Sequence, residues 1–240
     1  MNKQTLMTAL KWVASGLISL FLLGLLLGSC LFFYYVSKAP ELSESKLVAT
    51  TSSKIYDSQN NLIADLGSEK RVNVTTDQIP TDLVNAIVAI EDHRFFNHRG
   101  VDSIRIIGSI FNNILKRSNG LQGGSTLTQQ LIKQQVVGDA PTFSRKASEI
   151  IDALALERYM SKDDILTTYL NVAPFGRNNK GQNIAGVEEA AQGIFGVPAS
   201  KLTIPQAAFI AGLPQSPIVY SPYAADGSLK SAKDMTFGLN

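Results

Sequence analysis

The sequence has little cysteine and almost no net charge. Its 240 residues include one cysteine, and the formal net charge is only +2. Because Cys30 has no intramolecular partner, a disulfide-stabilised secreted scaffold is excluded. The near balance of charge carries no nucleic-acid signal, so we expect no nucleic-acid partner. About 200 residues follow the N-terminal segment, enough for one domain with a sizeable core.

Charged residues are missing altogether between Trp12 and Val36. At about 1.5 Å per residue, this run can cross a hydrocarbon layer of about 30 Å with some tilt, so it predicts a transmembrane helix. The preceding tail, residues 1–11, carries Lys3 and Lys11 and no acid. The positive-inside rule therefore predicts a single-pass cell-membrane protein with a cytoplasmic N-terminus and an extracytoplasmic domain.

The remainder divides by pattern into four segments. Two short apolar stretches, 54–57 and 62–66, flank a polar turn and predict a β-hairpin, with 71–74 as a candidate third strand. Past Pro80 the apolar spacing becomes helical and stays helical. The predicted segments are a linker over 37–46, a small β pedestal between membrane and domain over 47–79, a helical domain over 80–223 and a polar tail over 224–240.

Glu91 ends the apolar stripe of a predicted helix. It shares one helical face with Val84, Ile87 and Val88, at spacings of three and four residues. Burial there would disfavour the ionised carboxylate and raise its pKa, which suits a proton-transfer group near neutral pH. The alternative is that Glu91 only marks the solvated end of a helix.

A second pattern predicts a helix start that could seat a phosphate. Thr126 and Gln129 have the spacing of a capping box, and glycines precede them. Free N–H groups at the helix N-terminus and the Ser125 hydroxyl would favour an anion. The alternative is a capped helix that binds nothing.

A third pattern gathers charge on one helical face. Arg145 and Lys146 precede Glu149 by four and three residues. The alternative to a site is a solvated charge cluster. In the functional interpretation the two cations receive a pyrophosphate, while Glu149 orients them or holds a divalent metal ion.

Together these patterns form a series of ordered motifs. They closely resemble the peptidoglycan glycosyltransferase domain of class A penicillin-binding proteins and monofunctional transglycosylases, and the resemblance covers roughly residues 12–223. A closing stretch over 207–217 resembles the same family. The motifs are Glu91-Asp92-x-x-Phe95-x-x-His98-x-Gly100, Gly124-Ser125-Thr126-x-x-Gln129-Gln130, Arg145-Lys146-x-x-Glu149 and Ile165-Leu166-x-x-Tyr169-x-Asn171.

The resemblance implies a mainly α, lysozyme-like fold that polymerises lipid II with inversion. It implies that Glu91 is the general base for the 4-hydroxyl of the acceptor sugar and that Glu149 is a second essential acid. Lys133, Arg145 and Lys146 would hold the departing undecaprenyl pyrophosphate. The substrate-binding residues carried over are Gly124, Ser125, Thr126, Gln129, Gln130, Lys133, Arg145 and Lys146.

The implied partners are lipid II, the growing glycan strand, membrane lipid and the cell-wall synthesis machinery. The sequence requires no cofactor, and it leaves Mg²⁺ or Mn²⁺ open. Two other functions stay open at this point. One is a lysozyme-like hydrolase or lytic transglycosylase, which needs a glutamate but no pyrophosphate cations. The other is a non-catalytic membrane scaffold.

Three further segments carry expectations. An apolar helix over 101–117 either enters the outer leaflet or is an ordinary core helix. The loop over 175–183 is rich in glycine and asparagine, which predicts an irregular, mobile substrate flap. The polar tail, with a candidate helix over 229–235, predicts a fragment of a bifunctional protein, the alternative being a complete monofunctional enzyme.

Overall fold

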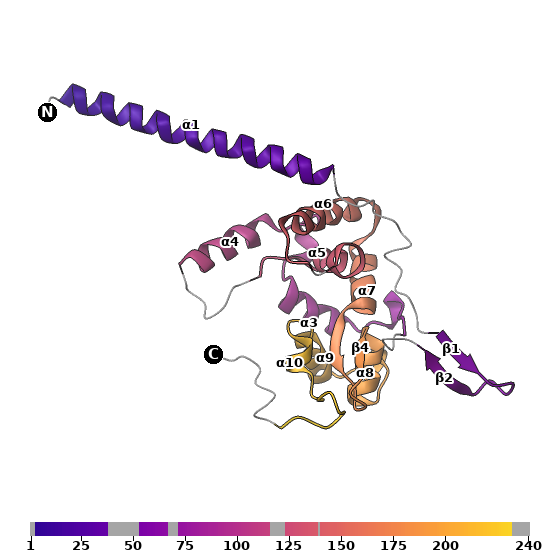
Figure 1. The fold of residues 1–240 in the computed structure, drawn as a ribbon. Coiled ribbons are helices and arrows are strands. Elements are labelled where there is room, and N and C mark those ends of the chain that lie inside the picture. The colour runs from indigo at the N-terminus through magenta and orange to yellow at the C-terminus, as the bar shows by residue number, and fades with distance from the viewer. Residues whose placement is uncertain (1–2, 38–52, 67–71, 116–122, 139, 232–240) are drawn as a thin grey trace.

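Helices surround a single apolar core below a long N-terminal helix (Figure 1). The computed structural model describes residues 3–37, 53–66, 72–115, 123–138 and 140–231. The mainly α prediction is confirmed. The helices of the body are α3 (Thr81–Glu91), α4 (Ser103–Ile114), α5 (Leu127–Ile132), α6 (Phe143–Tyr159), α7 (Lys162–Val172), α8 (Val187–Phe195), α9 (Ile204–Gly212) and α10 (Pro217–Tyr220).

Helix α1 (Lys3–Val36) is the predicted apolar helix, extended toward the N-terminus. Its segment Met7–Tyr34 is long and apolar enough to cross a membrane. The large apolar side chains along it are exposed, as expected for a helix whose surroundings are lipid rather than protein. The length and composition of this helix indicate a membrane-anchored protein.

The predicted hairpin is confirmed. Strands β1 (Ser53–Tyr56) and β2 (Leu62–Leu66) pair antiparallel, with a register irregularity beside Tyr56. Asp57 accepts hydrogen bonds from the backbone N–H groups of Gln59 and Asn61, each at 2.8 Å, which fixes the turn. The prediction of a third strand was wrong for residues 72–74, which do not form a strand. Most of the predicted linker, residues 38–46, lies outside the described residues.

The core lies where α5 packs against α6 and α7 and where α3 packs against α9. Asn171 in α7 joins the chain before the domain to this core. Its side chain accepts from the Val74 N–H at 2.8 Å and donates to the Val74 carbonyl at 2.9 Å. The largest side chains without solvent exposure include Tyr169, Phe95, Phe175, Leu83, Ile87, Leu127, Leu131 and Ile132.

Helix starts follow the capping signals in the sequence. The Ser161 hydroxyl accepts from the Asp164 N–H at 3.1 Å at the start of α7. Thr126 and Gln129 form the predicted capping box at α5, and Thr203 and Gln206 form another at α9. These caps define the residue at which each helix begins, and so they fix which helix residues face the core.

The segment predicted as an irregular flap is instead a second hairpin. Strands β3 (Pro174–Arg177) and β4 (Asn183–Ala185) pair antiparallel. Phe175 and Ile184 are buried, and Gly176 has a φ of +93° and packs so tightly on Ser221 and Pro217 that a Cβ would clash. Gly176 therefore serves close packing, and the Asn178 side chain fixes the turn by accepting from the Lys180 and Gln182 N–H groups. The expectation that the chain stays helical after Pro80 was wrong for residues 174–185, which form this hairpin.

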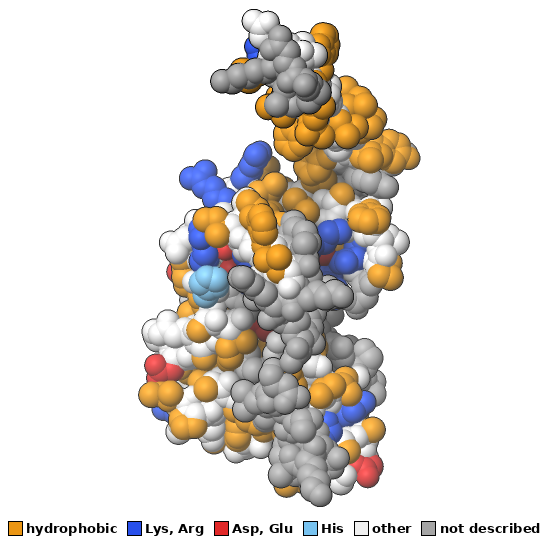
Figure 2. Space-filling model, turned by 90° about the vertical axis from the view of Figure 1, so that its left-hand side faces the viewer, with side chains coloured by type: hydrophobic (Ala, Val, Ile, Leu, Met, Phe, Trp, Pro, Cys, Tyr) orange, Lys and Arg blue, Asp and Glu red, His pale blue; other side chains and the backbone are white. Residues whose placement is uncertain are grey.

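Helix α4 is not an ordinary core helix. Figure 1 shows it projecting from the body on the same side as the N-terminal half of α1. Its exposed side chains include large apolar ones that recur at helical spacing, namely Ile104, Ile107 and Phe111, with Leu115 just beyond the helix. Figure 2 looks onto this side of the molecule, where hydrophobic side chains gather with Lys and Arg beside them.

Candidate active site

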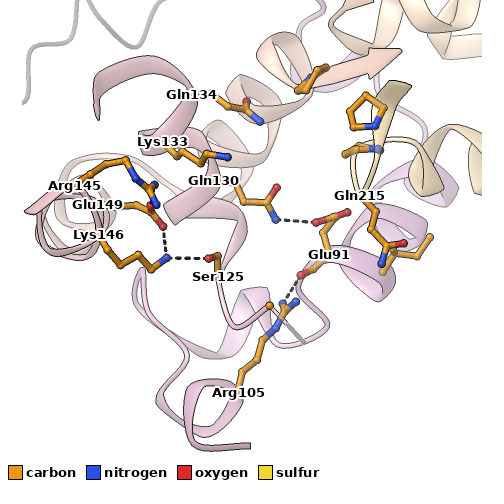
Figure 3. A pocket seen from close by; sticks show the side chains of 15 residues that line it. Glu91, Arg105, Ser125, Gln130, Lys133, Gln134, Arg145, Lys146, Glu149 and Gln215 are labelled. Carbon is orange, nitrogen blue, oxygen red and sulfur yellow. Dashed lines mark hydrogen bonds and ion pairs between the residues drawn. The ribbon is translucent and has the colours of Figure 1, made fainter. Parts of the chain in front are cut away.

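A pocket of about 900 Å³ opens between the end of α3, the start of α5 and the first half of α6 (Figure 3). Charged and amide side chains from several elements converge on it. Its lining residues are Ile90, Glu91, Arg105, Gly123, Ser125, Gln130, Lys133, Gln134, Arg145, Lys146, Glu149, Pro174, Pro214, Gln215 and Pro217. Glu91 and the Arg145–Lys146–Glu149 cluster thus share one cavity.

Glu91 is the last residue of α3 and is only 8% exposed. Burial raises its pKa, against the opposing hydrogen bond from Gln130 and the nearby positive charge of Arg105. The predicted burial of this carboxyl and the direction of its pKa shift are both confirmed. A buried carboxyl that faces a pocket can take up a proton under conditions in which an exposed glutamate stays ionised.

Gln130 and Tyr169 orient the Glu91 carboxylate. The Gln130 amide donates to Glu91 Oε2 at 2.7 Å, and the Tyr169 hydroxyl donates to Gln130 Oε1 at 3.3 Å. Tyr169 is fully buried, and burial followed by the nearby Glu91 charge raises its pKa well above the ordinary value. The phenol therefore stays a donor, which fixes the orientation of the Gln130 amide.

Asp92 fixes α5 against the end of α3. Its buried carboxylate accepts from the Leu127 N–H at 3.0 Å, at the first turn of α5, and lies 2.9 Å from His98 Nε2. An acceptor at a helix N-terminus is favoured by the unpaired N–H groups and by the helix dipole. Sequence reasoning assigned no role to Asp92, although it follows Glu91 directly in the first motif.

The predicted cation cluster forms as its spacing indicates. Arg145 Nη1 lies 2.6 Å from Glu149 Oε2, and Lys146 Nζ pairs with Glu149 Oε1. Lys146 also donates to Ser125 Oγ at 2.9 Å, so the helix face reaches the loop before α5. Glu149 is only 1% exposed and forms ion pairs with both Arg145 and Lys146. The side chains of Arg145 and Lys146 are themselves partly exposed and line the pocket. Glu149 therefore orients two positive groups toward the cavity.

Lys133 and Gln134 enter the pocket from a π-helical turn, η3 (Lys133–Val137), that continues α5. Such turns occur often at functional sites. The Gln134 side chain lines the pocket, and its oxygen is buried without a hydrogen-bond partner among the described residues. Sequence reasoning found Lys133 but missed Gln134, because helical spacing does not indicate a π-turn.

Three predicted substrate-binding residues do not line the pocket. The buried Thr126 hydroxyl donates to the Gly100 carbonyl at 2.6 Å, and the Gln129 side chain accepts from the Thr126 N–H at 2.9 Å. A Cβ on Gly124 would lie 3.0 Å from Ser109 Oγ, so glycine there allows the loop to pass close to α4. In this structure these residues build the corner that holds Ser125, because the Thr126 hydroxyl, the Thr126 N–H and the Gln129 side-chain oxygen are already paired within the protein.

The other wall of the pocket comes largely from residues that sequence reasoning did not assign. Arg105 enters from α4, Pro174 from β3, Pro214 and Gln215 from the turn after α9, and Pro217 from the start of α10. The family resemblance of the stretch over 207–217 had pointed to part of this wall, because Pro214, Gln215 and Pro217 lie within that stretch. No local pattern marks Arg105 as a site residue, since it lies within an apolar helix.

Oxygen ligands for a divalent cation are sparse. No group of three or more His, Cys, Asp or Glu side chains that could hold a metal ion occurs in the part of the chain that the structure describes. Within the pocket, Glu149 already bonds Arg145 and Lys146. The residues present therefore do not fit a metal ion bound by protein ligands alone.

Comparison with known proteins agrees with this geometry. The family model described as Transglycosylase matches residues 59–238. The chain is 52% identical over 227 residues to penicillin-binding protein 1A of Streptococcus pneumoniae, covering 93% of this chain and 31% of the relative. It is 41% identical over 224 residues to penicillin-binding protein 1A/1B of Bacillus subtilis, covering 93% and 24%.

The chain thus spans about a third or less of the length of these two relatives. The family match includes both walls of the pocket and covers most of the chain. The chain belongs to the transglycosylase family, as the glycosyltransferase domain of the class A penicillin-binding proteins.

Proposed function

We propose that this chain polymerises lipid II into glycan strands, with Glu91 as the general base and undecaprenyl pyrophosphate as the leaving group. One observation carries the proposal. A buried carboxyl and a fixed group of cations line the same pocket, so a base and an anion seat can act on one bound substrate pair. Membership of the transglycosylase family supports the same reaction.

In the proposed step, the ionised Glu91 takes the proton from the 4-hydroxyl of the acceptor sugar. The hydroxyl oxygen attacks the anomeric carbon of the lipid-linked donor from the face opposite the pyrophosphate, which inverts the configuration. A hydroxyl is a weak nucleophile, and a positioned base typically contributes about 100- to 10,000-fold. Gln130 steadies the carboxylate through its 2.7 Å hydrogen bond.

The bond between the anomeric carbon and the pyrophosphate oxygen breaks as the new glycosidic bond forms. The departing pyrophosphate keeps that electron pair, and its negative charge develops beside Lys133, Arg145 and Lys146. Preorganised cations stabilise such charge without reorganisation during the reaction. Glu149 holds two of these cations in place. Lys146 also donates to Ser125 and Arg145 Nε to the Ala140 carbonyl, and the donors that these contacts do not use can bind the substrate.

A lipid-linked substrate has to reach the pocket from a bilayer. We infer that α1 crosses the membrane with its N-terminus in the cytoplasm, in agreement with Lys3 and Lys11 in the acid-free tail. We also infer that Ile107 and Phe111 of α4 enter the outer leaflet. Their side chains are 55% and 61% exposed on a helix that contributes Arg105 to the pocket, which supports this inference.

Labelled lipid II tests the proposed function directly. Lengthened glycan and released undecaprenyl pyrophosphate are expected from the full chain in detergent or proteoliposomes. Cleavage of preformed glycan without synthesis would instead indicate a hydrolase or lytic transglycosylase. If neither activity occurs with correctly folded protein, the chain is a scaffold and the proposal is wrong. We further propose that cell-wall synthesis proteins bind it, which co-purification from membranes of its source cell would test.

A further inference from the structure

Arg105 connects helix α4 to the end of the helix that carries Glu91. The Arg105 Nη1 group donates to the Glu91 main-chain carbonyl and lies 3.8 Å from Asp92 Oδ1. Figure 3 shows the guanidinium reaching toward Glu91 along the pocket wall. One side chain of α4 thus contacts two consecutive residues at the end of α3.

The position of this contact matters because Glu91 is the last residue of α3. The last carbonyls of a helix have no intrahelical partner and carry its negative dipole end. A guanidinium satisfies such a carbonyl and keeps its charge at any accessible pH. The same Nη1 group lies near Asp92, whose carboxylate is fully buried, and the Arg105 side chain lines the pocket.

We propose that Arg105 is a positioning residue that holds the last turn of α3, and with it the Glu91 side chain, against helix α4. The inference rests on the proposed function, since it gives Arg105 a part in placing the general base. Without Arg105, the carbonyl at the end of α3 would lose its protein donor and Asp92 would lose a neighbouring cation.

The charge of Arg105 also acts on Glu91. The pKa of Glu91 is raised mainly by burial and further by Asp92, whereas the Gln130 hydrogen bond and Arg105 lower it. Tyr169 lies close enough to Glu91 for the Glu91 charge to raise the pKa of the phenol. The other charged groups that line the same pocket are Lys133, Arg145, Lys146 and Glu149.

A matched control comes from a second arginine near α4. Arg94 Nε lies 3.3 Å from Asp102 Oδ2, and Asp102 caps the start of α4 by accepting from the Ile104 and Arg105 N–H groups. Arg94 is not among the residues that line the pocket. Arg94→Gln therefore removes an arginine ion pair at α4 without removing the contact to Glu91.

The experiment compares Arg105→Gln, Arg105→Lys and Arg94→Gln in the full chain. The Glu91 carboxyl is titrated by NMR with ¹³C-labelled glutamate and assigned by the loss of its signal in Glu91→Gln. Polymerisation of lipid II is measured across pH in the same detergent. Because the NMR titration needs no turnover, it decides the role of Arg105 even if the chain lacks polymerase activity.

Arg105→Gln is expected to move the Glu91 titration and the acid limb of the rate profile to higher pH. It should also lower the plateau kcat about 10- to 100-fold through misplacement of the base. Arg105→Lys should keep the titration closer to that of the parent, because the charge remains, but restore the plateau only in part, because an ammonium cannot reproduce the guanidinium fork. Arg94→Gln should change neither quantity.

Three results would overturn the assignment. One is a Glu91 titration in Arg105→Gln that coincides with that of the parent. A second is a rise in KM with unchanged kcat, which would make Arg105 a substrate-binding cation instead. A third is an equal shift in Arg94→Gln, which would mean that any loosening of α4 has the same effect.

Discussion

The side-chain amide of Gln130 donates a 2.7 Å hydrogen bond to the carboxylate of Glu91. Gln130 lies on α5, which starts where Asp92 caps it, and Glu91 ends α3. The bond therefore joins the helix that carries Glu91, the proposed base, to the helix whose N-terminal loop carries Ser125, part of the proposed anion seat. A hydrogen bond within the protein thus places these two groups relative to each other.

Removing the carboxylate tests the proposed base. Glu91→Gln keeps the size of the side chain and an oxygen that can accept from Gln130, so the fold should persist. Polymerisation of lipid II should fall by about 100- to 10,000-fold, because a positioned general base contributes that much. Rates are measured with labelled lipid II, and circular dichroism checks the fold. Near-normal turnover would show that another group takes the proton.

The same variant should change the dependence of stability on pH. The folded protein binds the Glu91 proton more tightly than the unfolded chain does, because burial raises the pKa. Stability from this group is thus present at low pH and falls as pH rises from the ordinary glutamate pKa through the raised one. Glu91→Gln should not show this loss of stability at high pH, because its side chain does not titrate.

Thermal unfolding in detergent measures this difference. The Tm of Glu91→Gln minus that of the parent should be larger at about pH 8 than at about pH 4, on either side of the usual glutamate range. Asp163→Asn, at an exposed acid in the first turn of α7, serves as the control. A difference that is the same at both pH values would argue against a raised pKa.

Gln130→Leu removes a donor that favours the ionised form of Glu91. The Gln130 hydrogen bond lowers the pKa of Glu91, so its loss should raise that pKa further and move the acid limb of polymerisation to higher pH. Tyr169→Phe should shift the limb in the same direction but less, since Tyr169 acts only through Gln130. A limb that stays in place in both variants would show that this hydrogen bond is not made in the substrate complex.

Lys146→Ala tests the anion seat. The loss of one preorganised cation is expected to cost about 100- to 1,000-fold in turnover. Arg145 still pairs with the buried Glu149, so the Tm should fall little. Lys201→Ala, an exposed cation outside the pocket, controls for net charge. An unchanged rate with Lys146→Ala would remove this residue from the leaving-group site.

Tryptophan replacement tests the contact of α4 with lipid. In a Trp12→Phe background, which removes the chain's single tryptophan, Phe111→Trp should show quenching by brominated acyl chains in proteoliposomes. Ile204→Trp is the control, because that side chain is also exposed and its helix, α9, lies away from α4 in Figure 1. Equal quenching at both positions, or none at Phe111→Trp, would contradict insertion of α4.

The link between α7 and Val74 predicts a large effect on stability. Asn171→Ala leaves two buried backbone groups of Val74 without partners, which typically costs about 1–3 kcal/mol for each such group. Thr167→Ala removes only the exposed hydrogen bond between the Thr167 and Thr76 hydroxyls and should cost under about 1 kcal/mol. Chemical unfolding in detergent compares the two. Equal losses would mean that Asn171 does not anchor this segment.

Local patterns predicted much of the secondary structure. The capping box at Thr126 starts a helix as expected, and Ser161 and Thr203 start helices in the same way, because side-chain oxygens satisfy N–H groups within the same few residues. The hairpin over 174–185 was missed because its turn residues look irregular on their own. Only packing on Ser221 and Pro217 shows why glycine stands at position 176.

The sequence by itself determined the apolar N-terminal helix, the mainly α class and the residue types of the site, because periodicity, capping and the spacing of Arg145, Lys146 and Glu149 act within a few turns of chain. Only the tertiary structure decided which residues face the pocket. It placed Thr126 and Gln129, already joined by the predicted capping box, outside the pocket and brought in Arg105, since burial and hydrogen-bond partners depend on elements far apart in the sequence.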